Sequence, residues 1–228
     1  MTDRYENSMA GGAGFDLSQL VDDLKPVRPI RVAEGMALAL AMMLVVGMLV
    51  YGLLGVRADI MAGRPHMMFL LRWASLLVLG LATGYAALAS ARPAVNPHDG
   101  RSIWKPVLAL SSLFPLGAVV AFLRAPPENS VQAMDMFRPF WGLECLIVSV
   151  VGGVIVATAM ILWLRRGAPG SPERTGMLVG IASGAMAGSA YSIACPMNTL
   201  LYVGTWASLA ILLSSLLGRY IVPRFLAW

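Results

Sequence analysis

Long stretches of this chain carry no charged residue. Four such runs cover residues 35–56, 73–91, 106–123 and 145–164. A fifth run of 44 uncharged residues lies between Arg174 and Arg219. A helix needs about 20 apolar residues to cross a hydrocarbon core of roughly 30 Å. The fifth run is long enough for two crossings, and the turn-forming residues 195–199 (CPMNT) divide it.

This pattern predicts an all-α protein, an integral membrane bundle of six transmembrane helices. Helices are expected because lipid offers a backbone amide no hydrogen-bond partner outside its own helix. Composition agrees, with 58% hydrophobic and 13% charged residues. So apolar a chain excludes a soluble enzyme and a disordered chain, and it makes the lipid bilayer the first expected partner. The helices are expected at residues 32–55, 67–90, 103–123, 140–164, 175–195 and 200–222.

The basic residues are distributed unevenly between the connections. With a cytoplasmic N-terminus, twelve of the 17 Lys and Arg residues fall on the inner side and four on the outer side. The inner group is Arg4, Lys25, Arg28, Arg31, Arg92, Arg101, Lys105, Arg165, Arg166, Arg174, Arg219 and Arg224. The outer group is Arg57, Arg64, Arg124 and Arg138. This uneven distribution predicts that both termini are cytoplasmic. The net charge of +5 therefore reflects the basic inner connections and does not indicate direct nucleic-acid binding.

Few residues offer chemistry. Paired histidines, a phosphate-binding loop, a catalytic triad and a CxxC motif are all missing from the sequence, so neither catalysis nor a resident cofactor is predicted. The ionisable residues inside the expected spans lie near helix ends, where long side chains extend to the interface. Arg72 and Glu144 share the outer half of the bundle, and an ion pair between them is the alternative. These residues are Glu34, Arg72, Lys105 and Glu144.

The two cysteines are expected at the same depth. Cys145 is 19 residues before Leu164 and Cys195 is 20 residues after Thr175, near the inner ends of consecutive helices. At about 1.5 Å per residue, both lie roughly 29–30 Å above the inner face. A disulfide is one reading, if the Cα atoms approach within about 7 Å. A soft metal ion bound by two thiolates, with Glu144 or His66 as a further ligand, is another. Two unrelated buried cysteines are the third.

Glycines recur every four residues along the fifth expected helix. Such a row lets another helix approach closely, because helices in lipid associate through van der Waals contact. The partner is either a helix of the same chain or a second copy, which would make a homo-oligomer. The row consists of Gly176, Gly180, Gly184 and Gly188.

Residues 1–31 are expected to form a cytoplasmic tail ahead of the membrane domain, which spans residues 32–228. Within the tail, residues 15–24 predict a short amphipathic helix, with Leu17, Leu20, Val21 and Leu24 on one face and Asp16, Asp22 and Asp23 off it. So short a helix is marginal in water by itself. Its acidic residues favour docking in a protein groove over docking on anionic lipid.

Several motifs together resemble a known family. A DDL helix is followed by KPVRP (25–29), GVRAD (55–59), a cysteine early in the fourth expected helix, LRRGAP (164–169) and a second cysteine fifty residues after the first. This order resembles the NrsF-type membrane anti-sigma factors, negative regulators of extracytoplasmic-function sigma factors in proteobacteria. The resemblance implies a six-helix protein of the bacterial inner membrane whose cytoplasmic part holds a sigma factor inactive. It also implies that Cys145 and Cys195 sense heavy-metal or oxidative stress from the periplasmic side, a regulatory metal ion being the one possible cofactor.

On this reading, the apolar face of the tail helix inserts into a groove on the sigma factor. Asp22 and Asp23 then pair with basic residues of the sigma factor. Two other functions remain as alternatives. A membrane thiol–quinone redox protein would need a CxxC or a second cysteine pair, which the sequence lacks. A small transporter would need inverted repeats and broken helices, and Pro115 is the one obvious break within an expected span.

Overall fold

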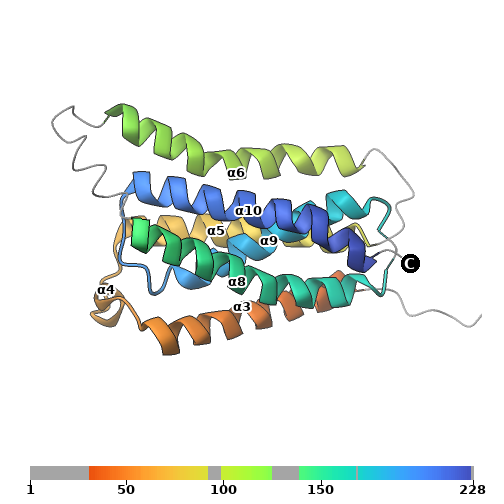
Figure 1. The fold of residues 1–228 in the computed structure, drawn as a ribbon, viewed down its shortest axis with the longest axis horizontal. Helices are drawn as coiled ribbons and strands as arrows, with labels where there is room; N and C mark the ends of the chain where they lie inside the picture. Colours follow the sequence, from red (N-terminus) through yellow and green to blue (C-terminus); the bar gives the residue numbers. More distant parts are fainter. Residues whose placement is uncertain (1–30, 92–98, 125–138, 168, 227–228) are drawn as a thin grey trace, which may run out of the picture. The chain divides into compact units, whose positions relative to one another are not determined.

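The computed structural model describes residues 31–91, 99–124, 139–167 and 169–226, and for residues 99–104 and 139–141 only the backbone. The described residues form helices and no strands, so the all-α prediction is confirmed for them (Figure 1). The helices are α3 (Val32–Leu54), α4 (Ala58–Met61), α5 (Met67–Ala89), α6 (Asp99–Arg124), α8 (Pro139–Leu164), α9 (Pro172–Tyr191) and α10 (Leu200–Leu226).

Each of the six helices expected from residue 32 onward corresponds to one long helix of the structure. The bounds differ most at α9, which begins at Pro172 and ends at Tyr191. Cys195 therefore lies beyond the helix, in the connection to α10. The four-residue helix α4 was not predicted, because four residues are too few to show a periodic pattern. The tail helix predicted at residues 15–24 lies outside the described residues.

Five of the long helices are long and apolar enough to cross a membrane. Their mean hydropathies range from 1.6 to 2.7. The remaining long helix, α9, is not among them; it is rich in glycine and serine and has Glu173 and Arg174 in its first turn. Of the six predicted membrane spans, five therefore meet this criterion. The five are Val32–Leu54, Met67–Ala89, Lys105–Arg124, Gly142–Leu164 and Leu200–Leu226.

Helix α9 forms the centre of the packing. It contacts α10, α5, α8 and α3 (Figure 1), and 15 of its 20 residues are buried. Helices α8 and α9 run antiparallel, since Cys145 shares a cavity with Tyr191 while Gly153 lies against Gly184. A helix surrounded in this way needs small side chains for close approach more than it needs bulky apolar ones for contact with lipid. This explains its low hydropathy.

The glycine row of α9 packs against α10 of the same chain. A Cβ atom added at Gly176 would lie 2.5 Å from the Gly218 carbonyl oxygen, and one added at Gly180 would meet the Ser214 carbonyl oxygen still more closely. At Gly184 an added Cβ would lie 2.7 Å from Ser214 Oγ. These glycines therefore serve packing within one chain. The alternative, a homo-oligomer formed through this row, is not supported, because α10 covers Gly176, Gly180 and Gly184, and Gly188 lies against Leu76 and Ser149.

The exterior of the helices is apolar. Large hydrophobic side chains such as Met48, Leu53 and Leu123 are 73%, 81% and 76% exposed. A water-soluble protein rarely exposes apolar surface on this scale. The surface is therefore suited to contact with lipid chains.

The structure also separates two ends of the bundle. Gly35 packs against Trp163 at one end, which is also where exposed arginines gather in the helix connections and in the last turns of α10. We call this the basic end; its exposed arginines are Arg165, Arg166, Arg174, Arg219 and Arg224. The opposite end contains α4 and the connection between α9 and α10. We call it the cysteine end.

Candidate functional site

Residues 192–199 connect α9 to α10 and carry Cys195, and we call them the Cys195 segment. The segment leaves α9 in turns, in which the backbone amides of Ser192 and Cys195 donate to the carbonyl oxygens of Gly188 and Tyr191 at 3.0 and 3.2 Å. Cys195 is only 1% exposed, and its thiol is free. The segment has little regular structure of its own, so side chains from other elements must hold it.

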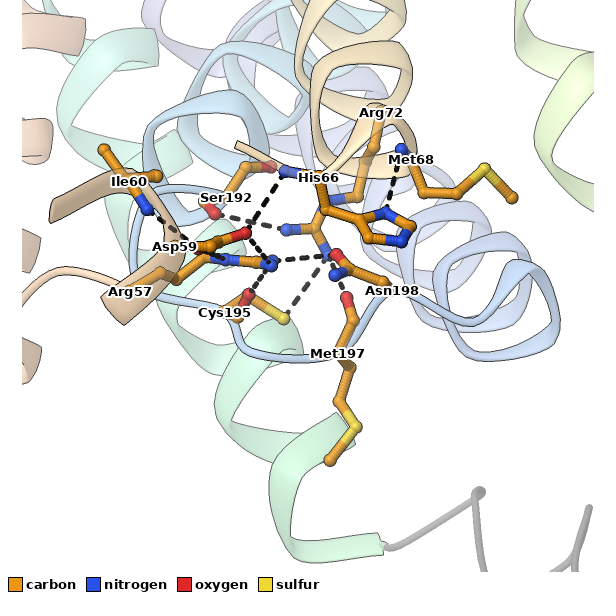
Figure 2. Close-up of polar contacts among 10 residues, drawn as sticks. All are labelled: Arg57, Asp59, Ile60, His66, Met68, Arg72, Ser192, Cys195, Met197 and Asn198. Carbon is orange, nitrogen blue, oxygen red and sulfur yellow. Dashed lines mark hydrogen bonds and ion pairs between the residues drawn. The ribbon is translucent and has the colours of Figure 1, made fainter. Parts of the chain in front are cut away.

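Arg57 is the first of these side chains. Its Nη1 donates to the Cys195 carbonyl oxygen at 2.7 Å and to Asn198 Oδ1 at 2.8 Å (Figure 2). Its backbone amide donates to the Ile193 carbonyl oxygen at 3.2 Å. Gly55 makes this placement possible by ending α3 with a φ of +81°, a conformation that side-chain-bearing residues rarely adopt. Arg57 therefore joins the end of α3 to the Cys195 segment.

Asp59 fixes the orientation of the Arg57 side chain. Arg57 Nε donates to Asp59 Oδ1 at 2.9 Å and Nη2 donates to Oδ2 at 2.7 Å. This bidentate pairing is the strongest geometry available to an arginine and a carboxylate. The guanidinium carbon also lies 5.4 Å from the centre of the Phe69 ring, within the range of a cation–π contact. Arg57 is thus held on several sides and has little freedom to reorient.

The ion pair of Arg57 and Asp59 is insensitive to physiological acidification. The hydrogen bonds from Arg57, and then those from the His66 and Ile60 amides, lower the pKa of Asp59 from 3.8 to about 2. A carboxyl whose pKa is lower in the folded protein stabilises the fold above its unfolded pKa. That contribution is lost as the pH falls from about 4 toward 2. A mild fall in pH therefore does not act as a signal at this pair.

Arg72 of α5 is the second arginine that holds the Cys195 segment. Its Nη2 donates to the Ser192 carbonyl oxygen at 3.2 Å, and its Nη1 donates to the Met197 carbonyl oxygen at 3.0 Å. The same Nη1 lies 3.4 Å from Cys195 Sγ (Figure 2). Hydrogen bonds from a charged donor contribute about 1.5–3 kcal/mol each, so the two carbonyl contacts hold the segment firmly.

Both sequence-based expectations for Arg72 are wrong. The side chain is 7% exposed and does not extend to the interface. It also forms no ion pair with Glu144; the described ion pairs are Arg57–Asp59 and Arg219–Glu173. The reason is that backbone carbonyl oxygens freed at the end of α9 take the place of a carboxylate.

Cys145 approaches the same site from α8. It lines a small cavity of about 20 Å³ together with Arg72, Tyr191, Ser192 and Tyr202. A cavity of this size holds about one water molecule. The structure therefore brings Cys145 and Cys195 to one end of the bundle. Arg72 lines the cavity that Cys145 also lines, and its Nη1 lies beside Cys195 Sγ.

The further ligands suggested for a metal ion do not join the cysteines. Among the described residues, no group of three His, Cys, Asp or Glu side chains is close enough to hold a metal. His66 Nδ1 instead accepts from the Met68 amide at 3.2 Å, which caps the start of α5. A metal ion bound here would therefore be coordinated by the two thiolates and by ligands that the described His, Asp and Glu side chains do not supply.

Sequence reasoning identified the two thiols and missed the residues that hold them. Arg57 was counted only as an outer charge and Asp59 only as part of a motif, while Asn198 was taken as a turn former. The GVRAD motif was the available signal, since it places an arginine and an aspartate two residues apart directly after the glycine that ends α3. The predicted sigma-binding residues (Leu17, Leu20, Val21, Asp22, Asp23 and Leu24) lie outside the described residues.

Comparisons with known proteins agree with the motif-based resemblance. The family model described as "Negative regulator of sigma F" matches residues 20–228. The anti-sigma-F factor NrsF of Caulobacter vibrioides is 27% identical over 205 residues, which cover 89% of this chain and 90% of that protein. The probable anti-sigma-F factor NrsF of Azospira oryzae is 24% identical over 181 residues, 79% of this chain and 82% of that protein. No solved structure gives a match. The chain belongs to the NrsF family of negative regulators of sigma F.

Proposed function

We propose that this protein is a membrane-bound anti-sigma factor that sequesters an extracytoplasmic-function sigma factor and releases it under heavy-metal or oxidative stress. The observation that carries the proposal is the family match over residues 20–228, on a chain with five membrane-capable helices. The family is regulatory, which gives no support to a thiol–quinone enzyme or a transporter. The sigma factor is the partner that the family description implies.

The proposed topology has six spans in the bacterial inner membrane with both termini in the cytoplasm. Helix α9 is the fifth span in chain order and completes the six; its 20 residues are about 30 Å long at 1.5 Å per residue. Its packing along α10, α5 and α8 supports this assignment, because neighbouring helices shield its small and polar residues from lipid. The exposed arginines of the basic end support a cytoplasmic location for that end.

The sigma-binding element in this proposal is the amphipathic segment of residues 15–24. Its apolar face offers anchors to a groove on the sigma factor, as in other helix-in-groove complexes. Asp22 and Asp23 beside that face suit a basic partner surface, and such a surface is expected of a protein that meets promoter DNA. The negative charges orient the helix, and the leucines contribute most of the affinity.

The proposed sensor is the pair Cys145 and Cys195. Its support is the shared location of two free thiols at the cysteine end, around the buried Arg72. An oxidant that removes two electrons and two protons joins the thiols as a disulfide, and a soft metal ion displaces the same two protons. Either event changes how α8 and the Cys195 segment pack, which biases the bundle between two states.

The sigma-binding role is tested by Leu20→Asp in the full-length protein. A charge within the apolar face is expected to weaken sigma binding by about 2 kcal/mol or more, roughly 30-fold in Kd. Gln19→Asp adds the same charge on the opposite face and is expected to leave binding unchanged. Binding is measured as co-purification of the cognate sigma factor with the detergent-extracted protein. Equal retention of sigma by both variants would show that this face is not the binding element.

A further inference from the structure

One helix, α3, joins the cytoplasmic tail to the cysteine end of the bundle. Residue 31 ends the cytoplasmic tail, and α3 begins at the next residue, Val32. The helix ends at Leu54, three residues before Arg57. A helix of 23 residues is about 35 Å long, so α3 links the tail directly to the cysteine end of the bundle.

At the cysteine end, Arg57 follows α3 and is hydrogen-bonded to the Cys195 segment. Three acceptors of Arg57 belong to the Cys195 segment: the carbonyl oxygens of Ile193 and Cys195 and the side chain of Asn198. Because Asp59 and Phe69 fix the guanidinium, it cannot follow a moving carbonyl by turning alone. A displacement of the Cys195 backbone must then break these bonds or move the end of α3.

Elsewhere α3 is packed sparsely. Only 17% of its most apolar window is buried, as in α6, against 39%, 33% and 44% for α5, α8 and α10. Two close approaches to α8 remain: a Cβ added at Gly35 would be 2.8 Å from the Trp163 ring, and one added at Gly152 would be 2.8 Å from Val46 Cγ1. A helix held at few points along one neighbour can tilt against it as a rigid body with little loss of packing.

We propose that Arg57 is the residue that couples the state of Cys195 to the cytoplasmic tail, an inference that rests on the proposed sensing by the cysteines. Modification of Cys195 shifts the carbonyls of its segment, and Arg57 transmits the shift to the outer end of α3. The helix tilts against α8, and the tail that precedes its inner end changes its presentation to the sigma factor. Arg57 is a positioning residue and does not react itself.

The test uses Arg57→Gln in the full-length protein in its native membrane. Two quantities are measured with and without oxidant: a sigma-dependent reporter, and the fraction of Cys195 thiol that resists alkylation after denaturation. We expect Cys195 to be modified as in the wild type and unstressed repression to be retained, while induction is lost. Arg219→Gln removes an exposed arginine of the basic end and is expected to leave induction intact.

A milder variant keeps the test decisive if Arg57→Gln does not fold. Asn198→Ala removes one acceptor of Arg57 and leaves the Cys195 carbonyl bond, so induction should fall partway with normal Cys195 modification. Wild-type induction in the folded variants would overturn the coupling role. So would loss of Cys195 modification, because Arg57 would then act on the thiol and not on transmission. Failure of the proposed sensing itself is recognised separately, by normal induction in Cys195→Ser.

Discussion

Gly180→Leu is expected to prevent accumulation of the folded protein. Gly180 lies where α9 crosses α10, and a Cβ there would meet the Ser214 carbonyl group and lie 2.9 Å from the Ser215 Cα. These are backbone atoms of a helix that cannot yield without moving as a whole. The smaller change Gly180→Ala should already cost about 1–3 kcal/mol through overpacking. A leucine would force α9 and α10 apart and so disrupt the centre of the bundle.

Gly52→Leu is the matched control for this prediction. Gly52 lies in α3, and a Cβ there would have no heavy atom within 4 Å. Because leucine favours helix more than glycine does by about 0.5–1 kcal/mol, this variant should be as stable as the wild type or slightly more so. The measurement is the yield of monodisperse protein by size-exclusion chromatography after detergent extraction. Comparable yields for the two leucine variants would contradict the close packing of α9 on α10.

The variants Cys145→Ser and Cys195→Ser are each expected to abolish stress induction while unstressed repression is retained. Serine is close to cysteine in size, and each site offers its hydroxyl a partner. At position 195 the hydroxyl replaces the sulfur beside Arg72, and at position 145 it can bond to the carbonyl one turn earlier in α8. The fold should therefore survive. What is lost is a pair of thiols that can form a disulfide or bind a metal ion together.

The readout for the cysteine variants is a sigma-dependent reporter, compared in stressed and unstressed cells. Reversal of the wild-type response distinguishes the two chemistries, because a thiol reductant reverses a disulfide and a chelator removes a metal ion. Neither reagent should affect the serine variants. Normal induction in both single variants would exclude the cysteines as the sensor and leave the anti-sigma role untouched.

The long helices could be predicted from the sequence because membrane spans are encoded locally. An uncharged run of about 20 residues has few structural options in lipid, and the predicted bounds of α3 and α5 end within one residue of the structure. The end of α9 was harder to predict. The apolar pattern runs on through Ile193 and Ala194, although the helix stops at Tyr191. The residues that hold the following segment are distant in sequence and leave no local trace.

The candidate site was predictable only in part for the same reason. Counting residues along consecutive helices placed Cys145 and Cys195 at one depth, and the structure brings them to one end of the bundle. The roles of Arg57 and Arg72 depend on backbone carbonyls between 120 and 138 residues away. A carbonyl oxygen belongs to every residue, so the sequence pattern cannot indicate which one an arginine will meet. A buried arginine without a carboxylate therefore looks, in sequence, like an interfacial one.

We propose that this protein holds a sigma factor at the membrane and releases it under stress. The most direct test is the distribution of the tagged cognate sigma factor between membrane pellet and soluble fraction, in cells that contain the full-length protein. Most of the sigma factor should sediment with the membranes before oxidant or heavy metal is added and be soluble afterward. A sigma factor that is soluble before stress, or one that stays with the membranes throughout, would contradict this account.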